Sequence, residues 1–143
     1  MYRFVECSKS ENGKTCRAPT GVTSRSCKSM KHLPKVGKLM YVRGYVYAHS
    51  FGQIDGYQTT IYNPAVLVRG ELGTIRFGGF LWGYGGTGPK GLMHLFDKLG
   101  IKGVDVPSLC NGSPDFSITS FGEWWRITFA DNGKFNLEVK QTA

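Results

Sequence analysis

The sequence predicts an α+β fold, in which a mainly antiparallel β-sheet of meanders and hairpins carries one or two short helices. Two patterns support this fold. Over residues 38–82 and again over 122–140, β-branched and aromatic residues alternate with polar ones, and Gly, Asn and Pro separate the runs. Residues 89–99 instead repeat apolar side chains with a helical period. The 143 residues show no internal repeat, so we expect a single domain spanning 1–143.

The first third of the chain carries all of the excess positive charge. Residues 1–43 contain ten Lys or Arg and two Glu, a net charge of +8, whereas the remaining hundred residues hold eight basic and eight acidic groups. This asymmetry predicts contact with a polyanion or attraction of an anionic ligand, unless the segment only keeps the protein in solution. Residues 2–7 alternate as a short strand does. Residues 8–37 are rich in Ser, Lys, Thr and Gly without a steady period, so we expect a basic, loop-rich segment with one short helical turn at most.

The strand expected over residues 38–50 separates two kinds of side chain. The apolar face holds Val42, Val46 and Ala48, and the other face holds Tyr41, Arg43, Tyr45, Tyr47 and His49. Three further strands are expected over residues 56–63, 65–70 and 73–82. A turn at Asn63-Pro64 and a hairpin over residues 70–73 would connect them into an antiparallel meander.

One helix is predicted together with both of its ends. Four apolar residues fall at helical spacing and form one stripe: Leu92, Leu95, Phe96 and Leu99. Pro89 suits the first helical position, because its fixed φ fits a helix start and its missing N–H is not needed there. Gly100 suits the left-handed residue that ends a helix.

Beyond the helix we expect irregular segments and then a C-terminal hairpin. Its strands are expected over residues 122–129 and 134–140, on either side of the turn sequence Asp-Asn-Gly at 131–133. Because neighbouring side chains on a strand point to opposite faces, only one of Trp124 and Trp125 is expected in the core. The other indole would be available to a ligand beside Arg126.

Just before the helix, the sequence GYGGTGPKG over residues 83–91 has unusual backbone freedom. Glycines leave their backbone N–H groups unshielded, and consecutive N–H groups at a helix start form a site for phosphate or carboxylate. Thr87 would add a hydroxyl donor and Lys90 a full positive charge, whereas Trp82 and Tyr84 would stack on a base or another flat group. The alternative is a tight connection in which the glycines allow close packing.

This turn matches no complete phosphate-binding motif. The Walker A pattern G-x-x-x-x-G-K-[ST] is absent, and the G-x-G-x-x-G over residues 83–88 has no surrounding βαβ unit. We therefore expect an anion site without a dinucleotide-binding fold.

The sequence also lacks a complete catalytic or metal-binding motif, so we expect no enzymatic activity, cofactor or metal centre. There is no G-x-S-x-G, no H-E-x-x-H and no C-x-x-C. The alternatives are a nuclease that uses His49 and His94 as general base and acid, and an irregular metal site at Cys27 and His32. The N-terminal sequence MYRFVECSKS lacks an apolar signal segment, which favours a cytoplasmic protein with reduced cysteines and no membrane contact.

The tyrosine-bearing strand supports a second functional interpretation. Arg43 followed by Tyr45 and Tyr47 on one face is typical of strands on which single-stranded nucleic acids stack. The match to R-G-[FY]-[GA]-[FY]-V-x-[FY] is incomplete, because Val46 stands where Gly or Ala belongs. Tyrosines on strands also pack against cross-strand neighbours without any ligand. This interpretation predicts a basic nucleic-acid-binding module that uses residues 1–43, or an inhibitor of a nucleic-acid-processing, CRISPR-type defence enzyme.

The strand, the string G-Y-G-G-T-G-P-x-G-L and the short helix after it together resemble small bacteriophage anti-defence proteins that sequester nucleotide immune signals, of the anti-Thoeris and anti-CBASS sponge type. The resemblance covers residues 72–100. It implies a non-enzymatic viral protein in the host bacterial cytoplasm, which binds a cyclic ADP-ribose isomer or a cyclic oligonucleotide intact. It further implies a homo-oligomer with pockets where protomers meet.

By position in that motif, Trp82 and Tyr84 would stack on the base, and the Gly85–Gly88 turn with Lys90 would hold the phosphate. The complete predicted ligand-binding set is Trp82, Tyr84, Gly85, Gly86, Thr87, Gly88, Lys90, Arg76 and Arg126. This nucleotide-binding function is the main prediction from the sequence, and nucleic-acid binding is its alternative.

Overall fold

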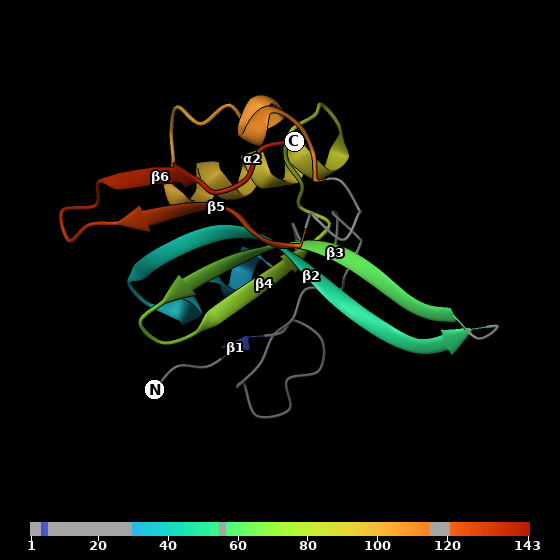
Figure 1. Ribbon diagram of the computed structural model, residues 1–143. Helices are drawn as coiled ribbons and strands as arrows, with labels where there is room; N and C mark the ends of the chain where they lie inside the picture. Colours follow the sequence, from blue (N-terminus) through green and yellow to red (C-terminus); the bar gives the residue numbers. More distant parts are fainter. Residues whose placement is uncertain (1–3, 6–29, 55–56, 115–120) are drawn as a thin grey trace.

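The computed structural model describes residues 4–5, 30–54, 57–114 and 121–143. In this part of the chain the strands form one six-stranded sheet in the order β1-β4-β3-β2-β5-β6, and helix α2 packs on one of its faces (Figure 1). Neighbouring strands are antiparallel except β1 and β4, which are parallel. The predicted α+β fold with a mainly antiparallel sheet is therefore confirmed.

The elements follow one another along the chain in the order strand, 3₁₀ helix, three strands, α-helix, 3₁₀ helix and two strands. Their bounds are β1 (Phe4–Val5), η1 (Met30–Val36), β2 (Leu39–Ile54), β3 (Tyr57–Gly70), β4 (Thr74–Gly78), α2 (Thr87–Leu99), η2 (Val106–Asn111), β5 (Gly122–Phe129) and β6 (Phe135–Val139). β2, β3 and β4 form the predicted meander, but β5 returns to pair with the other side of β2.

The N-terminal predictions can be compared with the structure only in part. β1 falls within the strand predicted over residues 2–7, and the rest of that prediction lies outside the described residues. Most of the predicted basic loop also lies outside them, whereas η1, a 3₁₀ helix of 7 residues at its end, is longer than the single helical turn expected there. At the other end of the chain, the predicted hairpin of β5 and β6 is confirmed.

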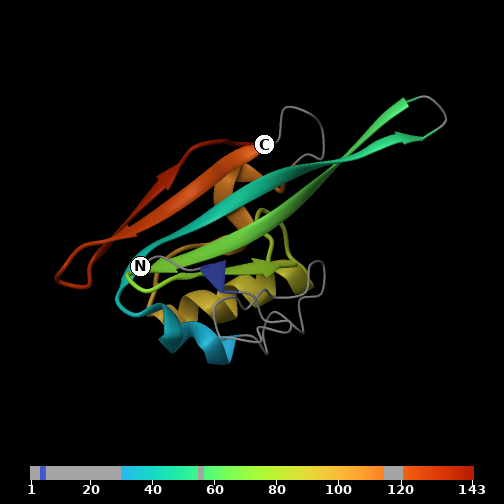
Figure 2. The same ribbon diagram turned by 90° about the horizontal axis from the view of Figure 1, so that it is seen from below.

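Strands β2 and β3 form a long antiparallel hairpin that extends beyond the rest of the sheet (Figures 1 and 2). β3 is continuous from Tyr57 to Gly70, so the turn predicted at Asn63-Pro64 is wrong. Pro64 pairs with Val46 of β2, but the pairing of β3 with β4 begins only at the following residue. A proline is tolerated there because, among the described strands, none lies on that side of β3 to require its missing N–H.

Strand β4 is shorter than the sequence predicted. It ends at Gly78, whereas the prediction extended to Trp82. Gly79 takes a positive φ of 78°, which ends the extended conformation. Phe80 and Trp82 are fully buried without belonging to a strand. The glycine thus ends the strand four residues before the predicted end. The predicted hairpin between β3 and β4 is confirmed.

A β-bulge between β2 and β5 changes which side chains of β5 reach the core. Gly44 pairs with Trp125, but the next residue of β2, Tyr45, pairs with Glu123, so Trp124 is the extra residue. Both indoles are consequently buried, with 2% of Trp124 and 0% of Trp125 exposed. The prediction that one of them would be available to a ligand is wrong, because the bulge interrupts the alternation on which it depended.

Helix α2 covers the sheet with the predicted apolar stripe, of which Leu92, Leu95 and Phe96 are buried. Gly100 ends the helix as predicted, in the left-handed conformation with a φ of 73°. The helix begins at Thr87, before the start predicted at Pro89. The proline is tolerated in the third helical position because the first-turn N–H groups have no acceptor within the helix.

The core lies between α2 and the sheet, and aromatic residues form much of it. The indole of Trp125 meets Trp82 and Phe96 edge to face, with ring centroids 5.7 and 5.6 Å apart. Each such pair contributes about 0.5–1.5 kcal/mol beyond its burial. The indole also covers Gly44, where an added Cβ would lie 2.2 Å from its nitrogen. This packing orients β2 so that its polar face, described next, points away from the helix.

Candidate functional site

The structure separates the predicted ligand-binding residues into three places: the core, the glycine turn and the opposite face of the sheet. Trp82 belongs to the core, where 0% of its surface is exposed. Its ring lies 6.3 Å from that of Trp124, measured between centroids. A ligand cannot stack on this indole from solution, so its predicted role is wrong. The glycine that ends β4 turns the chain inward before Trp82, and the sequence pattern did not show this.

Two glycines of the turn serve packing. Gly83 has a φ of 83°, its N–H donates to the Val106 carbonyl at 2.9 Å, and an added Cβ would lie 2.0 Å from the carbonyl group of Gly112. Gly88 is buried, and a Cβ there would lie 3.0 Å from the Gly79 carbonyl oxygen. For these two positions the close-packing alternative explains the glycine.

The rest of the turn is accessible. Thr87, Gly85 and Lys90 are exposed, as is Tyr84 with 39% of its surface. Within the described part of the chain, the backbone N–H groups of residues 84–88 donate no hydrogen bond. They lie at the start of α2, where the helix dipole favours an anion. The Tyr84 ring lies over the backbone of Gly86, 2.8 Å from where its Cβ would be. A smaller form of the predicted anion site therefore remains available, with Tyr84 as its aromatic residue.

Arg76 and Arg126 lie elsewhere. The guanidinium of Arg76 is 5.3 Å from the centroid of the Tyr47 ring, and that of Arg126 is 4.9 Å from the Tyr41 ring. Both tyrosines belong to the polar face of β2, on the side of the sheet away from α2. The structure thus brings these arginines together with the tyrosine strand and not with the glycine turn.

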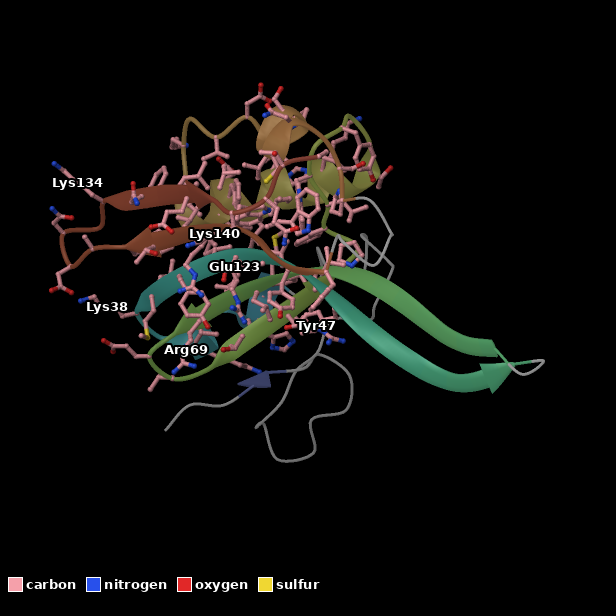
Figure 3. All side chains as sticks on the ribbon, in the orientation of Figure 1. Lys38, Tyr47, Arg69, Glu123, Lys134 and Lys140 are labelled. Carbon is pink, nitrogen blue, oxygen red and sulfur yellow. The ribbon has the colours of Figure 1, made fainter. Side chains whose placement is uncertain are left out.

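These residues form a continuous surface, which we call the Tyr-Arg face. β2 supplies alternate residues to it, and the flanking strands supply arginines and one glutamate. Its members are Tyr41, Arg43, Tyr45 and Tyr47 of β2, Arg69 of β3, Arg76 of β4, and Glu123 and Arg126 of β5. Figure 3 shows Tyr47, Arg69 and Glu123 spread over this side of the sheet. All eight are partly exposed.

The strand pairing explains why the arginines converge. Arg43 lies directly opposite Leu67 of β3 on one side and Arg126 of β5 on the other, and Leu67 lies opposite Arg76 of β4. Cross-strand partners point to the same face, so one row across four strands carries three guanidinium groups. Arg69 lies opposite Tyr41 in the next row.

Guanidinium groups and aromatic rings alternate along β2. The guanidinium carbon of Arg43 is 5.7 Å from the centroid of the Tyr41 ring and 4.9 Å from that of Tyr45. The rings of Tyr45 and Tyr47 are 4.8 Å apart. Such cation–π contacts contribute about 0.5–2 kcal/mol each and hold the arginine planes in fixed orientations. The surface is therefore ordered before any ligand binds.

Glu123 connects two of the arginines. Its carboxylate accepts hydrogen bonds from Arg126 at 2.7 and 3.1 Å and from Arg43 at 3.4 Å, and 19% of its side chain is exposed. The Nε of Arg43 is buried with no acceptor. With four arginines and this one glutamate, the Tyr-Arg face carries a net charge of +3. Glu138 of β6 lies opposite Arg126 and is paired with Lys140, so this second carboxylate leaves the net charge unchanged. The Tyr-Arg face therefore remains suited to an anion.

Among the described residues, the structure brings together neither a histidine pair for a nuclease nor a set of metal ligands. His94 is exposed on α2, and the side chain of His49 lies outside the described residues. His32 is half-buried, and its pKa is lowered by burial and by the positive charges of Lys35 and Lys31. Among the described residues no group of three His, Cys, Asp or Glu could hold a metal ion.

The cysteines give no sign of a reactive thiol where they are described. Cys110 is buried, its Sγ donates to the Trp124 carbonyl at 3.6 Å, and burial raises its pKa to about 11. A thiol with such a pKa is protonated and inert at neutral pH. Cys7, Cys16 and Cys27 lie outside the described residues.

In the described part of the chain, none of the helices has the length and apolar character needed to cross a membrane. No family model, curated protein or solved structure matches the chain.

Proposed function

We propose that the protein binds single-stranded nucleic acid on the Tyr-Arg face. The observation that carries the proposal is the ordered alternation of aromatic rings and guanidinium groups on a sheet face that α2 leaves open. Bases stack on tyrosine rings and on guanidinium planes, and the same guanidinium groups donate hydrogen bonds to phosphate. Base–aromatic stacking contributes about 1–3 kcal/mol per base.

The charge distribution favours a polymer over a small ligand. The face spans four strands, from Arg76 on β4 to Arg126 on β5, which is wider than one base needs. The net charge of +8 over residues 1–43 adds a long-range attraction for a polyanion. Glu123 repels phosphate but fixes two arginine side chains, so it orients the donors that the backbone of a nucleic acid would contact.

Binding at two salt concentrations tests this function. Fluorescence anisotropy would measure the affinity for a labelled single-stranded DNA and RNA of about 20 nucleotides, with a duplex as comparison, at about 50 and 200 mM salt. If the four arginines neutralise three or four phosphates, affinity for the single strands falls by roughly 20- to 50-fold between these concentrations. Weak binding of every single-stranded probe at low salt, or binding that salt does not change, contradicts the proposal.

A second candidate function is capture of a phosphorylated nucleotide signal at the smaller anion site. It is favoured by the backbone N–H groups of residues 84–88, which donate no hydrogen bond within the described part of the chain, and by the exposed side chains of Tyr84, Thr87 and Lys90 beside them. Calorimetry with a panel of cyclic nucleotides and ADP-ribose isomers tests it, followed by heat denaturation and mass spectrometry of the released ligand. We expect intact ligand and a weak dependence on salt. Cleaved products, or no heat of binding across the panel, would rule this candidate out.

A further inference from the structure

The two edges of the sheet differ in how they are covered. On one side β1 pairs with β4 through Phe4 and Val5 and covers part of that edge. On the other side lies β6, which pairs with β5 and has no second neighbour among the described strands (Figure 2). An uncovered edge presents a row of backbone donors and acceptors to which another strand can bind.

The hydrogen bonds of β6 show which of its backbone groups are unpaired. Directly before β6, the carbonyl of Lys134 accepts a hydrogen bond from the N–H of Ala130, the residue after β5. Directly after β6, the N–H of Lys140 donates one to the Trp124 carbonyl of β5, and both bonds measure 2.8 Å. Successive residues of an antiparallel strand direct their N–H and C=O groups to alternate sides. Hence the groups of the odd-numbered residues, Phe135, Leu137 and Val139, point away from the sheet.

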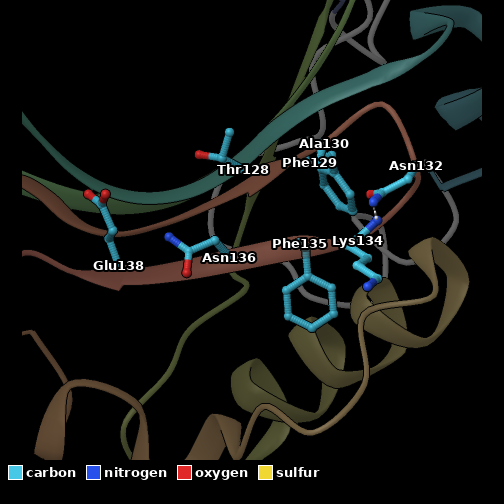
Figure 4. Close-up of a pocket in the computed structure, with 8 residues that line it drawn as sticks. All are labelled: Thr128, Phe129, Ala130, Asn132, Lys134, Phe135, Asn136 and Glu138. Carbon is cyan, nitrogen blue, oxygen red and sulfur yellow. Dashed lines mark hydrogen bonds between the residues drawn. The ribbon is translucent and has the colours of Figure 1, made fainter.

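The side chains of these three residues form an incompletely covered apolar row. Phe135 and Leu137 pack partly against the core, and 46% of the surface of Val139 is exposed. The ring of Phe135 points from β6 toward the helical layer, and it borders a hollow of about 470 Å³ that also reaches Thr128, Asn136 and Glu138 of the opposite face (Figure 4). A second hollow of about 430 Å³ borders Leu137 and Val139. Apolar side chains from an added strand would find space along this row.

The opposite face of β6 determines what strand fits. Its residues are Lys134, Asn136, Glu138 and Lys140, which carry charges of both signs. If a second β6 pairs antiparallel with the two-fold axis at Leu137, Lys134 faces the partner's Lys140. With the axis at Glu138, that carboxylate faces itself. With the axis at Asn136, Lys134 faces the partner's Glu138 at both ends, and no like charges lie opposite each other.

We propose that β6 forms a homodimer by antiparallel pairing with the β6 of a second copy, with the two-fold axis at Asn136. Phe135 then lies opposite the partner's Leu137, and the outward N–H and C=O groups of both strands bond each other. The charge pattern selects a second copy as occupant, because the strand is complementary to itself in this register. Pairing would join the two sheets, and their Tyr-Arg faces would lie on one side of the combined sheet.

A charge exchange tests this pairing. Lys134→Glu places a negative group opposite Glu138 at both ends, and Glu138→Lys places a positive group opposite Lys134. Each single variant should weaken self-association by about tenfold, measured by sedimentation. The double variant Lys134→Glu/Glu138→Lys should restore it, and an equimolar mixture of the two single variants should form a heterodimer. Lys98→Glu makes the same charge change on exposed α2 and should leave association unchanged.

Hydrogen exchange gives an independent measurement. On raising the protein concentration, the amide of Leu137 should become protected, while that of Asn136, which already faces β5, should not change. Circular dichroism of the single variants checks that each chain is folded. A wild-type protein that stays monomeric up to about 1 mM, the scale of the weakest associations, overturns the proposal. The proposal is also overturned by a dimer whose stability does not change in Lys134→Glu, Glu138→Lys or the double variant, or by one in which the Leu137 amide gains no protection. Either result would show that the copies associate through another surface.

Discussion

The glycine turn and the Tyr-Arg face differ in how their residues are assembled. The turn is one contiguous segment, but its residues have different roles in the structure. Trp82 fills the core, and Gly83 and Gly88 allow close packing, whereas Tyr84, Gly85, Thr87 and Lys90 are exposed. The Tyr-Arg face comes from four strands that are separate in sequence, and pairing joins its residues into one surface. Grouping residues by their closeness in the sequence therefore made the predicted site at the glycine turn too large. It also failed to reveal the Tyr-Arg face.

The two regions also differ in how a ligand would be held. At the turn the donors are backbone N–H groups beside a single lysine, which together suit one anionic group. On the Tyr-Arg face the donors are guanidinium groups held in place by tyrosine rings and by Glu123. The first arrangement suits a compact phosphate, and the second suits an extended chain of bases and phosphates. The variants below separate the two.

We expect the largest change in stability from a substitution of Trp82, because this indole belongs to the core and not to a ligand site. Trp82→Ala removes a fully buried indole and should lower the free energy of unfolding by about 3–5 kcal/mol, measured by urea denaturation. Tyr84→Ala, two residues further along the turn, is the matched control and should change it by less than about 1 kcal/mol. If Trp82→Ala abolished ligand binding with stability unchanged, the indole would have to be a surface residue after all.

The next prediction compares the stability effects of substituting two glycines of the turn, Gly83 and Gly85. Gly83→Ala combines a φ of 83° with a Cβ 2.0 Å from the Gly112 carbonyl group, so it should destabilise the fold by about 2–4 kcal/mol. At Gly85 an added Cβ has no atom within 4 Å, and Gly85→Ala should stay within about 0.5 kcal/mol of the parent protein. Thermal unfolding of both variants makes the comparison. Equal destabilisation would mean that the turn is one packed unit.

A smaller effect concerns nucleic-acid affinity. Tyr45→Ala removes a ring that contacts both Arg43 and Tyr47, and it should weaken binding of a single-stranded probe by about 5- to 150-fold. Tyr45→Phe keeps the ring and should retain most of the affinity. Lys90→Ala at the turn should leave the affinity for the single-stranded probe unchanged, but it should lower the affinity for a nucleotide signal. If Lys90→Ala and Tyr45→Ala lowered the affinity for the same ligand to a similar extent, the glycine turn and the Tyr-Arg face would belong to one site.

The sequence predicted those features that depend on local patterns. The faces of β2 around Val42 and Val46, the stripe of α2 and its end at Gly100 follow from periodicity and from glycine conformation, and the structure agrees. It could not predict the burial of both Trp124 and Trp125, because a bulge depends on the register between β2 and β5.

The same limitation applies to the candidate site. Tyr41, Arg43, Tyr45 and Tyr47 were recognisable as one face of a strand, whereas the positions of Arg69, Arg76 and Arg126 beside them depend on pairing across the sheet. Arg69 was not predicted at all, although alternation along β3 places it on the same face as Leu67. Knowing which strands pair, and in what register, would have been enough to find it.

The charge of Glu123 should have a smaller effect on nucleic-acid binding than the tyrosine rings. Glu123→Gln removes the carboxylate from the Tyr-Arg face and should raise affinity for a single-stranded probe by about two- to fivefold at low salt, with less gain at high salt, because screening weakens the repulsion removed. Its bonds to Arg43 and Arg126 are partly exposed, so the loss of stability should stay below about 1 kcal/mol. Glu71→Gln, an exposed position in the turn between β3 and β4, is the control and should not change affinity. A lower affinity in Glu123→Gln would show instead that fixed arginine orientations matter more than net charge.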